Sequence, residues 1–383
     1  MHTKNILFNN FKLKKKTSHT KRLLLKLLNE DNQILYSLGK NYEDSFTKKN
    51  LSKYKKYLNI RIIGMGGSSL GTKAIYSFLK HKIKKSIIFL DNLQPNLSKN
   101  NKKHLNLIVS KSGNTLETIV NSNIFTNKLD KNIFITENKK SYLYEQANKL
   151  KSDIIHHNNY IGGRYSVLSE VGMLPAILMG LKPSHFRQFN SIIKNKKFFN
   201  SLVQNVATTV FFLKSKKINS IILNYDEKAQ DFFNWYQQLI AESLGKKSKG
   251  LLPVISSLPK DNHSLMQLYL DGFKNNFFTF FYTHEYKSLR INNNKILSSY
   301  KYLKNKGLSE IIYAQKKATE NVFNKKNIPF RSFEIKNRDE KTLGELFCFF
   351  ILETILIGKS LNLNPYDQPA VELIKVETKK ILT

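Results

Sequence analysis

The residues that follow the apolar run Leu105–Ile108 constrain the fold of this chain more than any other segment. The next ten residues read VSKSGNTLET, after which apolar residues resume. This order predicts a buried strand, a tight turn and the start of a helix. Backbone N–H groups and the positive end of the helix dipole would converge at the turn, where Ser110, Ser112 and Thr115 would add hydroxyl groups. The turn therefore suits a bound phosphate.

An ordinary helix cap explains the same residues equally well. In this interpretation Asn114 or Ser112 caps the helix, and Glu117 lies favourably in its first turn. The motif by itself does not choose between a phosphate site and a cap.

The strand, turn and helix pattern recurs along the chain and favours an α/β fold with doubly wound parallel sheets. The expected strands are 59–63, 86–90, 105–109, 132–136 and 153–156 in the first half, and 220–224, 251–256, 277–283 and 331–335 in the second. The main expected helices are 22–28, 73–80, 167–179, 198–214, 227–244, 308–323 and 343–361. The two halves resemble repeats of one topology. Ligands of such sheets bind beyond the carboxyl ends of strands, where the glycine- and serine-rich turns fall.

The length favours two domains, because a chain of 383 residues is longer than a single hydrophobic core usually supports. We expect a basic N-terminal arm and helix over 1–50, a first domain over 51–185, a second over 186–362 and a C-terminal helix over 363–383. The basic run Lys12–Lys16 is expected to be solvated and mobile.

The strong positive charge first suggests nucleic acid as a partner. Lys and Arg number 63 against 28 Asp and Glu, which gives a formal net charge of +35. The excess is almost entirely lysine, however, whereas base recognition favours arginine. We therefore expect no nucleic-acid function, although a positive surface would steer an anionic substrate toward the protein.

The single cysteine and the hydropathy pattern bear on the compartment. Cys348 has no second cysteine to pair with, so disulfides within the chain and cysteine-based metal sites are excluded, and a reducing, cytoplasmic setting fits. The longest apolar stretch, 346–358, is interrupted by Glu353, which predicts no membrane association. The basic N-terminus lacks the apolar region and cleavage site of a secretory signal.

The glycine-rich segment 64–71 is not a nucleotide-binding motif. Its glycines fail the spacing of the dinucleotide fingerprint, and Asp91 only weakly offers the acidic residue expected at the next strand end. A Walker loop fails as well, because no Gly-Lys-Ser/Thr sequence closes the segment. We expect neither a nicotinamide cofactor nor a P-loop.

Two further segments contain candidate chemical groups. Arg164 follows two glycines that would let the backbone approach a ligand, although a surface ion pair is the ordinary alternative. Glu242 lies four residues after Gln238, so both share one face of a helix. A carboxylate near a helix C-terminus lies at the negative end of the helix dipole, which disfavours its charge. This placement is mild evidence that Glu242 has a functional role. An exposed glutamate remains the simpler explanation for it, and His263, on a loop, is equally ambiguous.

Six segments taken together resemble the glucose-6-phosphate isomerase family in its compact bacterial-type form. They occur in family order and span about residues 60–376: GMGGSSLG from Gly64, SKSGNTLET from Ser110, GGRYSVLS from Gly162, QLIAESLGK from Gln238, NHSLMQL from Asn262 and DQPAVELIK from Asp367. The second segment alone would indicate only a sugar-isomerase (SIS) domain, which enzymes and regulators share. Glu242, His263 and Lys375 narrow the resemblance to the isomerase.

The resemblance implies two SIS domains flanked by helices, with a C-terminal helix that completes the active site. The first domain would bind the phosphate, and the second would supply the base and the histidine. The implied reaction is the interconversion of glucose 6-phosphate and fructose 6-phosphate in glycolysis and gluconeogenesis, without a metal or organic cofactor.

The resemblance also implies a role for each matching residue. The groups expected to hold the phosphate are Ser110, Lys111, Ser112 and Thr115, with Gly67 and Ser68 beside the sugar. His263, helped by Lys375, would open the sugar ring. Glu242 would move the proton between C2 and C1 through a cis-enediol that Arg164 stabilises. Gln238 and Gln368 would orient the sugar hydroxyls and the base.

In the family the histidine comes from the neighbouring subunit, so the resemblance implies a homodimer with His263 donated across the interface. Two alternatives stay open. The loop has Ser69 after Ser68 where an acidic residue often follows the serine, so an isomerase that also accepts mannose 6-phosphate is one rival. A non-catalytic SIS sensor of phosphosugars is the other, although such a protein has no reason to keep Glu242, Arg164 and His263 together.

Overall fold

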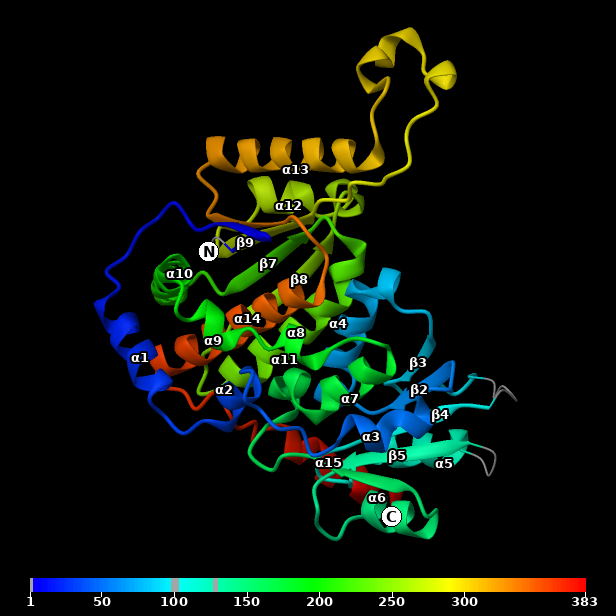
Figure 1. The fold of residues 1–383 in the computed structure, drawn as a ribbon. Coiled ribbons are helices and arrows are strands. Elements are labelled where there is room, and N and C mark those ends of the chain that lie inside the picture. Colours follow the sequence, from blue (N-terminus) through cyan, green and yellow to red (C-terminus); the bar gives the residue numbers. More distant parts are fainter. Residues whose placement is uncertain (1–2, 98–102, 127–129) are drawn as a thin grey trace.

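The computed structural model describes residues 3–97, 103–126 and 130–383, and its core is a pair of five-stranded sheets flanked by helices (Figure 1). In order across the first sheet the strands are β3 (Ser86–Leu90), β2 (Asn59–Ile63), β4 (Leu105–Val109), β5 (Lys131–Thr136) and β6 (Asp153–His156). All of them run parallel. The order turns back between β2 and β4, so the loops after these two strands form the crevice in which doubly wound sheets bind ligands.

The second sheet repeats this order. Its strands are β8 (Leu252–Ser257), β7 (Asn219–Asn224), β9 (Asn276–Thr283) and β10 (Phe330–Ile335), again all parallel, with β1 (Ile6–Asn9) beyond β10. The prediction of two doubly wound halves with one topology is confirmed, and each predicted strand lies within one residue of its observed bounds.

Strand β1 was not expected. Residues assigned to a basic arm instead pair antiparallel with β10, from Ile6 opposite Ile335 to Asn9 opposite Ser332. Only Ile6 and Phe8 are buried within this short strand, which is too few residues for a periodic signal in the sequence. The run 12–16 that follows is mostly exposed, as predicted, although the ammonium of Lys15 lies 3.6 Å from the centre of the Phe211 ring.

The helices largely follow the expected ranges. They are α1 (Ser18–Leu28), α2 (Gln33–Ser37), α3 (Lys48–Leu51), α4 (Leu70–Phe78), α5 (Leu116–Phe125), α6 (Tyr142–Lys149), α7 (Glu170–Leu178), α8 (Pro183–Phe186), α9 (Phe189–Ile192), α10 (Lys196–Lys214), α11 (Gln230–Leu244), α12 (Met266–Asp271), α13 (Leu308–Lys325), α14 (Glu340–Ser360) and α15 (Val371–Leu382). The range 167–179 is helical only from Glu170, because residues 163–168 form a tight 3-10 turn whose Ser166 hydroxyl binds the Gly163 carbonyl.

One continuous core joins the two halves. The face of the first sheet that packs on α4 and α7 and the face of the second sheet that packs on α10, α11 and α14 belong to the same cluster of buried side chains. At its centre Trp235 of α11 packs edge-on against Phe347 of α14, with ring centroids 4.8 Å apart. Helix α11 is therefore fixed between the halves, while α12 and α13 cover the opposite face of the second sheet (Figure 1).

Two segments stand apart from this core. Residues 285–307, between β9 and α13, project from the body of the molecule (Figure 1). The C-terminal helix α15 has no buried residue. None of the helices in the described part of the chain is long and apolar enough to cross a membrane.

A buried ion pair lies within the second half. Arg331 on β10 and Glu353 on α14 are both about 1% exposed and hydrogen-bonded to each other, and Asn205 of α10 binds both side chains. The pair links the sheet to two helices, so each charge depends on the other for its solvation.

We predict that Glu353→Leu lowers the free energy of unfolding by about 3–5 kcal/mol, because it leaves the Arg331 guanidinium buried and unpaired. Urea denaturation measures this loss. The double variant Arg331→Met/Glu353→Leu, which removes both charges, should recover most of the stability. A single variant as stable as the parent would contradict the argument.

Candidate functional site

The loop between β4 and α5 has the properties of an anion site. The buried Ser110 hydroxyl lies 2.9 Å from the Thr115 hydroxyl, so the loop folds back on itself at Gly113. Gly113 has a φ of +67°, and a Cβ there would lie 2.1 Å from the Ser141 hydroxyl oxygen, so only glycine fits. The first residue of α5 is thereby held at the crevice between β2 and β4.

The helix-cap interpretation of this loop is wrong. The residue at the cap position is Thr115, and it makes no side-chain capping bond. The Ser112 hydroxyl accepts from the Asn114 N–H at 3.3 Å, and the side-chain oxygen Oδ1 of Asn114 accepts from the Tyr142 N–H at 3.0 Å. The N–H groups that open α5 therefore remain available to an anion.

Lys111 adds a positive charge beside this loop. Its ammonium donates to the Asn159 carbonyl at 2.7 Å and lies 3.8 Å from Glu137. Burial lowers the pKa of the Lys111 ammonium, and Glu137 opposes that shift. The half-buried side chain is thus held near the loop rather than free in solvent.

The loop after β2 meets the turn that carries Arg164. A Cβ on Gly67 would lie 2.1 Å from the carbonyl carbon of Gly163, so the two backbones are in direct contact. Gly66 has a φ of +53° and approaches the Gln238 amide, from which an added Cβ would be 2.7 Å away. The half-buried Ser68 lies on the same turn. The close approach brings the first domain into contact with α11.

Arg164 lies at the centre of the site. Its side chain is 1% exposed and donates to the Ser243 hydroxyl at 2.8 Å, to Glu242 Oε2 at 3.2 Å and to Gln368 Oε1 at 2.6 Å. It also donates to the carbonyls of Pro365 and Asp367 at 2.7 and 3.0 Å. The alternative of a surface ion pair is wrong, since the guanidinium is buried between α11 and the segment that precedes α15.

Glu242 is partly open to a cleft. Its side chain is 29% exposed, and its second carboxylate oxygen, Oε1, accepts from the Gln238 amide at 2.9 Å. The exposed-glutamate alternative is therefore wrong. Around it lies a cleft of about 620 Å³, whose lining includes Lys246, Asp367 and Gln368. The arrangement leaves the Glu242 carboxylate at the cleft, positioned by an amide on one side and a guanidinium on the other.

His263 and Lys375 are not brought to this cleft. His263 is exposed at the end of the turn 260–263 and has no hydrogen-bond partner among the described residues. Lys375 is 61% exposed on α15, and its ammonium binds Glu372 of the same helix at 2.5 Å. Within one chain, the segment before α15, rather than the helix itself, reaches Arg164.

Several site residues were missed by the sequence analysis. The Ser243 hydroxyl accepts from Arg164 and lies 2.9 Å from the Tyr165 hydroxyl, which also donates to the Pro365 carbonyl. Lys246 binds Asp367 at 2.5 Å and ties the end of α11 to the C-terminal segment. The motifs that include Tyr165, Ser243 and Lys246 were recognised, but a carbonyl acceptor such as Pro365 leaves no signal in a sequence.

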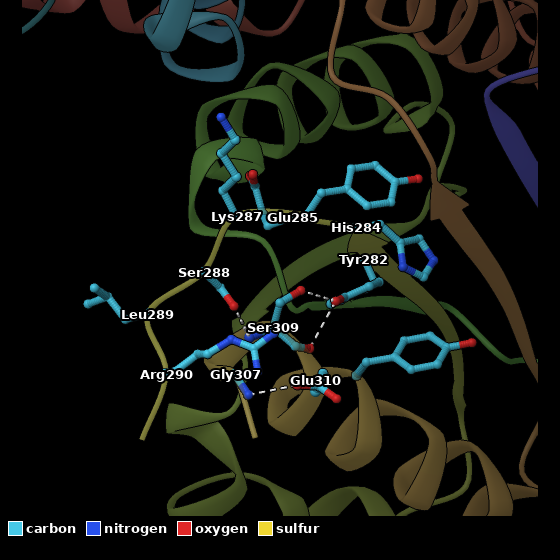
Figure 2. A pocket seen from close by; sticks show the side chains of 12 residues that line it. Tyr282, His284, Glu285, Lys287, Ser288, Leu289, Arg290, Gly307, Ser309 and Glu310 are labelled. Atoms are coloured by element: carbon cyan, nitrogen blue, oxygen red, sulfur yellow. Dashed lines mark hydrogen bonds between the residues drawn. The ribbon is translucent and has the colours of Figure 1, made fainter. Parts of the chain in front are cut away.

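A larger cavity, of about 820 Å³, lies under the projecting segment in the second half (Figure 2). It borders the N-terminus of α13, but the groups there are already satisfied. Glu310 accepts from the Gly307 N–H at 2.7 Å, and the Ser288 hydroxyl accepts from the Ser309 N–H (Figure 2). Because side chains of the protein already occupy these backbone donors, this helix end offers less to an anion than the start of α5 does. The cleft at Glu242 is therefore the better candidate despite its smaller volume.

The sequence of this chain matches the family model described as phosphoglucose isomerase over residues 47–251. A similar protein, the glucose-6-phosphate isomerase of Methanocaldococcus jannaschii, is 34% identical over 367 residues, which cover 89% of this chain and 88% of that protein. The range that the family model matches includes the loop between β4 and α5, residues 110–115, which we call the anion loop. It also includes Arg164, Gln238 and Glu242, whereas Gln368 lies beyond it.

Solved structures share the fold. A hypothetical protein from Thermus thermophilus superposes with a TM-score of 0.82 at 24% identity, over 96% of this chain and 94% of that one. A glucose-6-phosphate isomerase from Chlamydia trachomatis superposes with a TM-score of 0.72 at 19% identity, over 98% of this chain and 80% of that one. At these identities the likeness supports the architecture of two linked sheets.

We predict that Gly67→Ala lowers the free energy of unfolding by about 2 kcal/mol or more, because its methyl group would overlap the Gly163 backbone. Gly162→Ala is the matched control, since an added Cβ there meets nothing nearer than 3.9 Å. Urea denaturation of both variants tests the close approach. Equal stability of the two would show that the loops can separate without cost.

Proposed function

The chain belongs to the phosphoglucose isomerase family, and we propose that the cleft around Glu242 is where it interconverts glucose 6-phosphate and fructose 6-phosphate. The observation that carries this proposal is the placement of Glu242 beside Arg164, on a helix whose Gln238 is in contact with the glycine loop after β2. Proton transfer next to a carbonyl requires a carboxylate base, a group that stabilises the enediolate oxygen and a fixed handle on the substrate.

The anion loop supplies the handle. The open N-terminus of α5, the hydroxyls of Ser110, Ser112 and Thr115, and Lys111 would hold the phosphate. Gly67 and Ser68 would lie along the sugar. Binding energy gained at the phosphate, which does not react, can then be used to position the reacting carbons.

Glu242 would act as the base. Its carboxylate takes the proton from C2 of the open aldose and returns it to C1, while a proton moves between the two oxygens of the cis-enediol. Arg164 would stabilise the negative charge that develops on those oxygens. Two glutamines would fix the positions of these groups. Gln238 donates to Glu242, and Gln368 accepts from Arg164.

We predict that Glu242→Gln reduces turnover of fructose 6-phosphate by about a thousandfold, because an amide cannot accept the C2 proton. Exchange of that proton with solvent should be lost, whereas the Kd of fructose 6-phosphate should change little. Glu145→Gln, at an exposed position on α6, is the control for loss of a carboxylate. Normal turnover in Glu242→Gln would contradict the assignment, and the same assay with mannose 6-phosphate defines the sugar specificity.

Ring opening requires a group that the single chain does not place at the cleft. We propose that the protein acts as a homodimer in which His263 enters the cleft of the neighbouring subunit, with Lys375 assisting after α15 moves toward the sugar. The exposure of His263 without a partner in the described part of the chain supports this assignment. A cytoplasmic location completes the proposal and agrees with the single cysteine, Cys348.

We predict that mixing two inactive variants restores activity. Subunits carrying Glu242→Gln and subunits carrying His263→Ala, exchanged at equal amounts, would form mixed dimers in about half of the molecules. Each mixed dimer would have one intact cleft, so about a quarter of the parent activity should return. A histidine that acts within its own chain would give no recovery, which would contradict the exchange.

A further inference from the structure

A basic pocket lies at the amino ends of β5 and β6, which is the end of the first sheet away from the anion loop. Its volume is about 480 Å³, and it is lined by Lys53, Tyr54, Lys56, Tyr57, Asp130, Lys131, Asn132, Lys149, Leu150, Lys151, Ser152 and Asp153. Strands β5 and β6 begin at this pocket, whereas the residue after β5, Glu137, donates its N–H to Lys111 of the anion loop. The two sites are therefore separated by the length of a strand.

The charges around this pocket do not cancel. The carboxylate of Asp130 is fully buried and paired with Arg61, and that of Asp153 is bound by Lys53 and by the Tyr54 hydroxyl at 2.7 and 2.8 Å. The remaining lysines, at positions 56, 131, 149 and 151, have no ion pair within the described residues. Four like charges around one hollow attract an anion of several charges, with a strength that falls as salt rises.

Asn132 offers an amide donor to the pocket. Asn132 is 8% exposed, and its side-chain oxygen accepts from the Asn106 amide at 2.8 Å. The same amide nitrogen also donates to Asp130, while Arg61 donates to the Asn106 oxygen, so the orientation of Asn106 is fixed. The amide nitrogen of Asn132 then has no acceptor in the described part of the chain. This nitrogen is not among the buried polar atoms that lack a partner, so it is open to the pocket and can donate to an acceptor oxygen of a ligand.

One part of the pocket wall is apolar. The rings of Tyr54 and Tyr57 have centroids 6.5 Å apart, and Leu150 is 44% exposed beside them. Tyr57 is only half-buried, so one aromatic face is available. A planar ring can stack on such a face while its phosphates lie among the lysines.

We propose that this pocket binds a nucleoside triphosphate, with its phosphates at Lys131, Lys149, Lys151 and the Asn132 amide, and its base against Tyr57 and Leu150. The site is independent of the isomerase cleft, so the nucleotide and the sugar phosphate bind together.

Isothermal titration of the full-length protein with ATP at physiological salt tests this proposal. We expect saturable binding that fructose 6-phosphate does not displace. The double variant Lys131→Gln/Lys151→Gln should bind ATP about tenfold more weakly, or weaker still. The control, Lys196→Gln/Lys197→Gln, removes the same charge from exposed positions on α10 and should bind ATP like the parent. Turnover of fructose 6-phosphate should be unchanged in both double variants, which also verifies their folding.

Further binding experiments test which parts of the nucleotide the pocket recognises. Asn132→Asp, which is nearly isosteric, should abolish ATP binding by replacing the donor with a carboxylate. Tripolyphosphate should bind more weakly than ATP, and adenosine should not bind. Displacement by fructose 6-phosphate, an equal loss in the control, retention of ATP binding in Asn132→Asp, or tripolyphosphate binding as tight as that of ATP would each overturn the proposal.

Discussion

The buried guanidinium of Arg164 is the interaction on which the site depends. A charge that is 1% exposed is tolerated only when its donors are satisfied, and the acceptors that satisfy this one come from two distant segments. Helix α11 supplies Glu242 and Ser243, and the segment before α15 supplies two carbonyls and Gln368. The charge therefore organises the cleft as well as taking part in it. Trp235 strengthens the arrangement, because its indole N–H donates to the carbonyl of Arg164 itself.

The two halves share a strand order but differ at the crevices where their orders turn back. In the first half the crevice is lined by glycines, hydroxyls and the open end of a helix. In the second it is closed by an ion cluster, in which Arg338 binds Asp226 at 2.8 Å and Glu285 at 2.9 Å while its guanidinium covers the Phe78 ring of α4. The second crevice thus serves the contact between the halves. A repeat of topology does not require a repeat of function.

A single chain assembles only part of the chemistry. Glu242, Arg164 and the glycine loop after β2 come together because α11 and the turns that meet it are anchored in one continuous core. His263 and Lys375 lie on exposed elements that this core does not hold. The division follows from packing, because side chains fixed by the core form a preorganised cleft, whereas side chains on exposed elements are not positioned by the single chain.

The sequence by itself determined the strands, the doubly wound fold class and the identity of Arg164, Gln238, Glu242 and Gln368. These features depend on local periodicity, glycine positions and motifs, which are properties of neighbouring residues. Strand β1, the carbonyls that bind Arg164, the uncapped start of α5 and the closed second crevice were decided only by the tertiary structure. Each of them depends on contacts between residues far apart in the chain or on backbone groups that every residue carries, so no pattern in the sequence distinguishes them.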